Sequence, residues 1–137
     1  MTTADHTPAT DAGWTKGVAA VTLFVEDLDA TTTFYHDVFG KPMVHQDDVS
    51  AAFDFGTSII NLLATSAAPE LVDPASVAAP DAGVRMVLTV GVDDVDAVCA
   101  QLASLGVPLL NGPLDRPWGI RTASFQDPSG HLWEIAR

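Results

Sequence analysis

The chain has 137 residues, of which 47% are hydrophobic, so it is long enough for one domain with a sizeable core. Its formal net charge is −12 with only 6 Lys and Arg residues, which disfavours DNA, RNA and anionic membranes as partners, because phosphate binding needs clustered cations. The acidic surface is either a well-solvated face or an attraction for a cationic small molecule.

The N-terminal segment 1–15 is polar and is expected to form a flexible tail before a single domain at 16–137. It lacks the basic and apolar parts of a signal peptide, and no run of about 18 apolar residues predicts a membrane span. The only cysteine, Cys99, has no partner for an internal disulfide. These features predict a cytoplasmic protein with a reduced core cysteine.

A first module at about 17–65 begins with an apolar strand at 18–25 and a helix that Asp27 or Asp29 is placed to cap. The apolar residues of that helix recur at helical spacing and are expected to face a sheet: Phe34, Tyr35, Val38 and Phe39. Gly40 suits the left-handed position that ends helices. Three shorter strands are predicted to follow, at 42–46, 51–55 and 58–64.

Residues 66–83 carry three prolines and many alanines, which predicts a linker between two modules or a loop lying over a site. The sequence VEDLDA at 25–30 then returns as VDDVDA at 92–97, about half a chain later, so a second module is expected at 84–137. Its helix should bury Val95, Val98, Cys99, Leu102 and Leu105. Its strands are predicted at 84–92, 107–110, 120–126 and 131–136, with a loop at 111–118.

The resulting βαβββ–βαβββ order, with VEDLDATTTFYHDVFG at 25–40 and RPWGIRTASFQDPSGHLWEI at 116–135, resembles the vicinal oxygen chelate superfamily. This superfamily includes glyoxalase I, extradiol dioxygenases, fosfomycin-resistance enzymes and bleomycin-resistance proteins. The resemblance implies an α+β fold of two βαβββ modules, each forming a curved half-barrel. It also implies a homodimer with sites where modules meet.

In metal-dependent relatives, four inward positions hold a divalent cation through His, Glu or Gln. The resemblance places these positions at Ala20, Asn61, Val87 and Glu134, of which only Glu134 is a standard ligand. We therefore predict no metal cofactor, and a divalent metal is expected only if this alignment is wrong.

The four histidines do not supply a replacement, because none has a spacing typical of zinc ligands. His6 falls in the tail, and His36 is expected to be a solvated residue of the first helix. His45 lies on a strand that does not usually supply ligands in the family, and His131 is expected to make a structural hydrogen bond.

Strand alternation is expected to point Glu134 into the cleft. There it would be either paired with Arg85 or available as a base or as an anchor for a cation. A mostly apolar cavity beside it, typical of a small-molecule pocket, would be lined by Phe24, Asn61, Leu63, Val87 and Thr89.

Trp118 and Arg121 are two further candidates for ligand contact. Trp118 would stack on a planar or cationic ligand at the cleft mouth, or pack its loop onto the strands. Arg121 would reach either a ligand carboxylate or an internal aspartate.

Three functions remain open from the sequence. The first is a metal-free protein that binds or sequesters a small hydrophobic or cationic molecule, similar to bleomycin-resistance proteins. The second is a lyase, isomerase or dioxygenase of the glyoxalase type, including a metal-free version that uses Glu134 as the base. The third is an accessory module whose cleft is filled by side chains.

Overall fold

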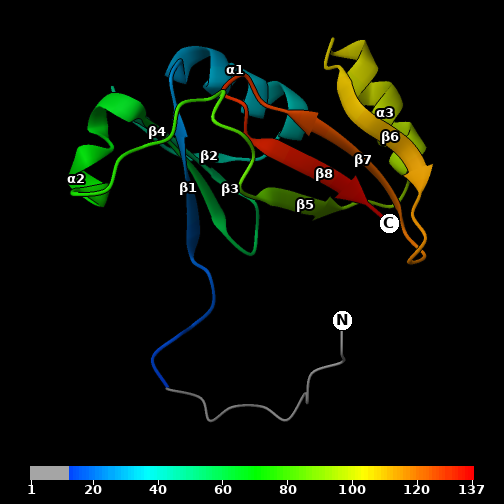
Figure 1. Cartoon of the computed structure of the whole chain (residues 1–137), viewed down its shortest axis with the longest axis horizontal. Helices are drawn as coiled ribbons and strands as arrows, with labels where there is room; N and C mark the ends of the chain where they lie inside the picture. Colours follow the sequence, from blue (N-terminus) through cyan, green and yellow to red (C-terminus); the bar gives the residue numbers. More distant parts are fainter. Residues whose placement is uncertain (1–12) are drawn as a thin grey trace.

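The structure, a computed structural model that describes residues 13–137, contains two modules of the same plan (Figure 1). The first module comprises β1 (Ala20–Val25), α1 (Leu28–Phe39), β2 (Met43–Gln46), β3 (Ser50–Asp54) and β4 (Ile59–Ala64). The second comprises β5 (Val87–Gly91), α3 (Val95–Ser104), β6 (Leu109–Asp115), β7 (Arg121–Gln126) and β8 (Leu132–Ala136). The predicted α+β class and the βαβββ repeat are confirmed.

Each module forms one open four-stranded sheet, with the strand orders β1-β4-β3-β2 and β5-β8-β7-β6. The first and last strands of each module pair in parallel, and the other neighbours are antiparallel. Side chains alternate between the two faces of a strand, so each sheet has a core face and an opposite face, which we call the outer face. The edge strands β1 and β5 belong to different sheets, and the linker runs between them (Figure 1).

Both long helices begin at an aspartate whose side chain satisfies a free N–H group of the first turn. Asp27 Oδ1 accepts a hydrogen bond from the Ala30 N–H at 3.0 Å, and Asp94 does the same for Ala97 at 3.0 Å. Asp29 lies inside the first turn of α1, where its charge complements the helix dipole. Helix α1 ends at Gly40, whose φ of 61° is left-handed as predicted.

One hydrophobic core joins the core faces of both sheets to α1 and α3. Tyr35 and Phe53 of the first module and Phe125 and Trp133 of the second are at most 2% exposed. The rings of Phe39 and Trp133 approach with centroids 4.6 Å apart, so α1 packs against a strand of the other module. Cys99 is also buried in this core, and burial raises the pKa of its thiol.

A buried hydrogen-bond network fixes the turn before β8 against α1. The Tyr35 hydroxyl donates to Asp127 Oδ2 at 2.8 Å and accepts from Trp133 Nε1 at 2.9 Å. The other carboxylate oxygen of Asp127 accepts from the backbone N–H groups of Ser129 and His131. Burial and the nearby Asp127 carboxylate raise the pKa of Tyr35 well above its usual range. The network therefore ties the two modules together through polar groups that are all satisfied.

Strand β6 corrects the prediction of a loop from 111 to 118, because it continues to Asp115. Its register with β7 is irregular between Asn111 and Leu114, and Gly112 has a φ of 86° there. A Cβ on Gly112 would lie 2.5 Å from the Thr122 carbonyl oxygen, so the close approach of the two strands requires glycine. Gly-Pro pairs usually mark turns, which is why the sequence predicts a loop where the structure has a bulged strand.

Three smaller differences concern the linker and the ends of elements. The segment between the modules contains η1 (Thr65–Ala67) and a short helix α2 (Pro69–Val72), neither of which was predicted from the sequence. Leu105 is 45% exposed instead of buried, because α3 ends one residue earlier. Strand β5 begins at Val87, paired with Leu132 at the start of β8, so residues 84–86 precede the strand. Within residues 13–137, no helix has the length and apolar character needed to cross a membrane.

Candidate functional site

A groove of about 400 Å³ lies where β1 of the first module meets the start of β5 and β8 of the second. We call it the junction groove. Its lining comes from β1 and the residue that follows it (Thr22, Leu23, Phe24 and Glu26), the segment before β5 (77–80 and 83–86), Leu88 of β5, and the turn before β8 with the first residue of that strand (129–132). Pockets of about 300–1,000 Å³ are typical of small-molecule sites, so the junction groove has room for a ligand of modest size.

The linker forms one wall of this groove and lies directly against the turn before β8. A Cβ placed on Gly130 would meet the Pro80 carbonyl oxygen at 3.3 Å, which measures how closely the two segments approach. The sequence offered a loop over a site as one interpretation of residues 66–83, but it did not identify Val77, Pro80 or Met86 as lining residues. The only available signal was the composition of the linker, since the contact depends on tertiary packing.

His131 lines the groove and contacts β1 of the other module. Its Nε2 lies 2.7 Å from the Phe24 carbonyl oxygen, and because that oxygen only accepts, Nε2 carries the hydrogen. The structural hydrogen bond predicted for His131 is therefore confirmed. Its Nδ1 has no hydrogen-bond partner among residues 13–137.

Arg85 lies in the groove lining between Val84 and Met86, which are about half exposed. Among the residues that the structure describes, Arg85 makes no hydrogen bond or ion pair. The Arg85–Glu134 pair that the sequence left open does not form, because Arg85 precedes β5 instead of lying on it.

The predicted site residues of the first module lie on the outer face of its sheet. Asn61 is in register with Thr22, and its Nδ2 lies 3.4 Å from the Thr22 Oγ1. Leu63 shares this face and is almost fully buried, whereas Phe24 is half-buried and also lines the junction groove. Ala20 is in register with Ile59 at the exposed start of β1.

The predicted site residues of the second module lie on the corresponding face of the other sheet. Glu134 is in register with Thr89, whose hydroxyl donates to Glu134 Oε1 at 3.0 Å. Val87 precedes Thr89 on the same face and is 46% exposed. Trp133, beside Glu134 in sequence, faces the core as strand alternation requires. Within residues 13–137, the lining of the junction groove does not include Val87, Thr89 or Glu134.

The four positions that the resemblance aligns with the metal ligands of metal-dependent relatives do not supply a divalent-cation donor set here. Ala20 and Val87 have aliphatic side chains, so Asn61 and Glu134 are left as the only donors. Within residues 13–137, no group of 3 or more His, Cys, Asp or Glu side chains could hold a metal ion. The residues present therefore do not fit the metal centre of those relatives.

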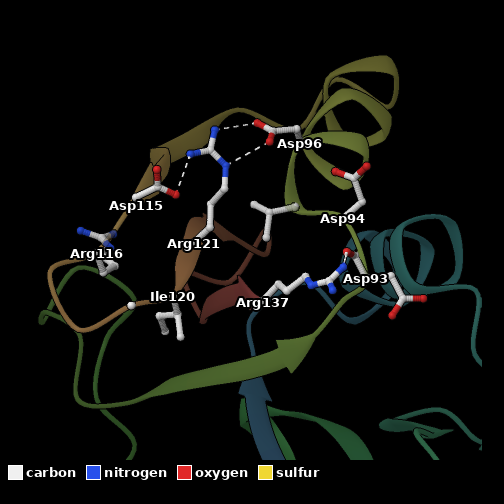
Figure 2. Close-up of a pocket in the computed structure, with 10 residues that line it drawn as sticks. Asp93, Asp94, Asp96, Asp115, Arg116, Ile120, Arg121 and Arg137 are labelled. Carbon is white, nitrogen blue, oxygen red and sulfur yellow. Dashed lines mark hydrogen bonds and ion pairs between the residues drawn. The ribbon is translucent and has the colours of Figure 1, made fainter.

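Arg121 lies on the side of the second sheet that carries α3, and its guanidinium is held by two aspartates (Figure 2). Its Nη2 and Nε contact the two oxygens of Asp96 at 2.9 and 3.0 Å, and its Nη1 contacts Asp115 at 3.1 Å. These hydrogen bonds hold the pKa of the Asp96 carboxyl below its usual value. The sequence left open whether Arg121 reaches a ligand carboxylate or an internal aspartate, and the structure shows internal aspartates as its partners.

A surface hollow of about 620 Å³ surrounds this ion pair at the start of α3 (Figure 2). Its other arginines are also engaged, since Arg116 donates to Thr122 and Asn111, and Arg137 donates to the Asp93 carbonyl oxygen. The Arg121–Asp96 pair joins the β6–β7 hairpin to α3, whereas the Arg116 contacts lie within the hairpin. These contacts leave none of the three arginines of this hollow without a protein partner.

Trp118 lies in the loop between β6 and β7 and is 68% exposed. This exposure does not agree with the interpretation in which Trp118 packs its loop onto the strands. Trp118 does not belong to the lining of the junction groove. Its contact with a ligand therefore stays a prediction.

The remaining histidines have short-range partners. His36 lies 2.9 Å from Asp37 on the solvated side of α1, as predicted, and His45 of β2 lies 2.8 Å from Asp47. Hydrogen bonds from His45, Val49 and Ser50 hold the pKa of Asp47 well below its usual range. His6 falls outside the described residues.

Comparison with known structures supports this architecture. A lactoylglutathione lyase from Agrobacterium tumefaciens is 24% identical with a TM-score of 0.74, and the match covers 89% of this chain and 93% of that one. A glyoxalase/bleomycin resistance protein/dioxygenase from Nocardioides is 23% identical with a TM-score of 0.78, covering 87% and 81%. A glyoxalase-related enzyme from Fulvimarina pelagi is 26% identical with a TM-score of 0.75, covering 89% and 88%.

The sequence itself also matches a family model over nearly its whole length. The match spans residues 17–135, which include both βαβββ modules and the turn that Asp127 stabilises. The resemblance seen in the sequence motifs is thereby confirmed. The chain belongs to the Glyoxalase/Bleomycin resistance protein/Dioxygenase superfamily.

Proposed function

We propose that this protein binds a small, predominantly apolar molecule in the junction groove without using a metal ion. The observation that carries the proposal is the groove itself, about 400 Å³ in volume and lined by both modules and the linker. Phe24 contributes an aromatic surface, and Val77, Val84 and Met86 contribute aliphatic surface. The lack of a fitting donor set at the family's metal positions is consistent with a binding role.

Apolar contact alone gives this groove a limited affinity. Burying roughly 200 Å² of apolar ligand surface contributes about 5 kcal/mol at about 25 cal/mol per Å². A dissociation constant of about 1 μM corresponds to about 8 kcal/mol, so a tight ligand also needs polar contacts. We therefore expect micromolar or weaker binding for a neutral aromatic probe.

Glu134 supports a second candidate function, metal-free proton transfer. Thr89 donates to one of its carboxylate oxygens, and the other oxygen has no hydrogen-bond partner among residues 13–137. A partly solvated carboxylate of this kind could accept a proton from a carbonyl substrate on the outer face. This candidate predicts turnover of such a substrate that is abolished by Glu134→Gln.

The homodimer implied by the family is also part of the proposal. Apolar side chains remain exposed on the outer face of the second sheet, with Val87 at 46% and Leu114 at 36%. Pairing this face with a second copy would remove them from water. Light scattering coupled to size-exclusion chromatography should give twice the mass of the chain.

Probe binding by variants distinguishes the three places where a ligand could lie. Protein stripped of metal by a chelator is titrated with N-phenyl-1-naphthylamine, a neutral dye that fluoresces in apolar surroundings. Phe24→Ala alters the junction groove, Trp118→Ala alters the β6–β7 loop, and Glu134→Gln alters the outer face of the second sheet. Circular dichroism and the urea midpoint of each variant control for folding.

The proposal predicts saturable binding of one dye per chain that weakens about tenfold in Phe24→Ala and stays unchanged in the other two variants. A tenfold loss corresponds to about 1.4 kcal/mol, which is reasonable for removing much of one aromatic contact. Absence of saturable binding would overturn the proposal. So would binding that depends on Trp118 or Glu134 instead of Phe24, or binding that appears only after metal is restored.

A further inference from the structure

We infer that the junction groove selects an organic anion, a carboxylate with an aromatic or branched aliphatic body, and that Arg85 holds the carboxylate. The inference rests on the proposed function, because it names the class of molecule that the groove binds. It departs from the cationic ligand that the overall charge of the chain favours.

The inference is based on which of the four arginines have a hydrogen bond or an ion pair within the protein. Arg116, Arg121 and Arg137 are each engaged by protein oxygen atoms near the start of α3. Arg85 alone, within residues 13–137, has neither a hydrogen bond nor an ion pair, and it is the one arginine that lines the junction groove. A guanidinium offers a planar fork of N–H donors that matches a carboxylate. The groove therefore presents a free cation beside its apolar walls.

The immediate surroundings of Arg85 strengthen its attraction for an anion. Val84 and Met86 flank it in the lining, and the linker residues Val77 and Pro80 contribute further apolar surface. A ligand that covers these residues excludes water from one side of the guanidinium, and charges attract more strongly where the effective dielectric constant is lower. An apolar body and a carboxylate on the same molecule therefore support each other's binding.

Among the residues that the structure describes, Glu26 is the one carboxylate in the lining, and it makes a cation the competing ligand. It follows β1 where the chain leaves the sheet, and its preceding neighbour Val25 faces the buried core. Glu26 thus follows the last residue of β1, whereas Arg85 lies between Val84 and Met86, which also line the groove. At physiological salt, charges more than about 8 Å from the site are largely screened, so Arg85 and Glu26 affect an anion here more than the net charge of −12 does.

A matched set of competitors tests the sign of the charge that the groove prefers. Naphthalene-2-carboxylate, naphthalene-2-carboxamide and 2-naphthylmethylammonium share one ring system and differ in charge. Each is titrated as a competitor against N-phenyl-1-naphthylamine bound to the wild-type protein, to Arg85→Gln and to Arg116→Gln. Arg116→Gln is the control, because it removes an arginine that lies outside the junction groove.

We expect the carboxylate to bind the wild-type protein and Arg116→Gln about tenfold more tightly than the carboxamide, and Arg85→Gln to lose this preference. Equal binding of the three competitors, or tighter binding of the ammonium compound, would overturn the inference while leaving the proposed function intact. A preference for the carboxylate that survives in Arg85→Gln would also overturn it. Failure of the neutral dye to bind would remove the proposed function and this inference with it.

Discussion

Removal of the Tyr35 hydroxyl tests whether the polar network between the modules stabilises the fold. Tyr35 is fully buried, and its hydroxyl lies between Asp127 Oδ2 at 2.8 Å and Trp133 Nε1 at 2.9 Å. Tyr35→Phe keeps the ring and its aromatic contacts. It leaves the acceptor Asp127 Oδ2 and the donor Trp133 Nε1 buried without the Tyr35 hydroxyl as a partner.

The expected cost follows from those two groups. A buried polar group that loses its partner costs about 1–3 kcal/mol, and more when the group is charged. Asp127 keeps two backbone hydrogen bonds through its other oxygen, which limits its share of the loss. We therefore expect Tyr35→Phe to lower the free energy of unfolding by about 3 kcal/mol, a large part of the 5–15 kcal/mol typical of a domain.

Urea unfolding followed by tryptophan fluorescence measures this change. With a slope of about 1–3 kcal/mol per molar urea, the midpoint should fall by about 1–3 M. Thr33→Val, which removes an exposed hydroxyl from the same helix, is the control and should stay within about 0.5 kcal/mol. A change of less than about 0.5 kcal/mol in Tyr35→Phe would refute the role assigned to the network.

Three further results are expected. Tyr35 is the only tyrosine, and its pKa is raised in the folded state. Its contribution to the free energy of unfolding should therefore be fully present below about pH 10 and should fall by up to about 1.4 kcal/mol per pH unit above it. Tyrosinate absorbance should appear only when the protein unfolds. Gly112→Ala should lower the urea midpoint more than Gly119→Ala does. The new Cβ would lie 2.5 Å from a carbonyl oxygen at Gly112, whereas Gly119 has a similar φ and open space around it. Equal shifts would contradict the close approach of the two strands. In Arg121→Gln, the carboxyl pKa of Asp96 measured by NMR should rise toward its usual value. The stabilisation that the Arg121–Asp96 ion pair gives the wild type, and that the wild type loses at acid pH, should then be absent. An unchanged pKa would contradict the ion pair.

Much of the fold could be predicted because its signals are local. The repeated VEDLDA and VDDVDA segments place an aspartate before each helix, and Asp27 and Asp94 do cap α1 and α3. Alternation along β8 separated Glu134 from Trp133 onto opposite faces of the sheet. These features depend on the spacing of neighbouring residues, which a sequence displays directly.

The candidate site was less predictable because it depends on contacts between distant segments. The hydrogen bond from His131 to the Phe24 carbonyl oxygen joins residues separated by 107 positions, and no periodicity reports such a contact. The position of Arg85 depends on β5 starting at Val87, where its partner strand begins at Leu132. Of the predicted ligand-contacting residues, Phe24 lines the junction groove, whereas Arg121 is held by aspartates elsewhere.

Amide chemical-shift mapping of metal-stripped, ¹⁵N-labelled protein with naphthalene-2-carboxamide tests the central claim most directly. A neutral ligand is chosen so that the outcome does not depend on the charge preference of Arg85. Binding in the junction groove predicts saturable shifts concentrated at Phe24, Gly83 and His131. Shifts confined to Thr89 and Glu134, shifts around Trp118, or shifts that require added metal would contradict it.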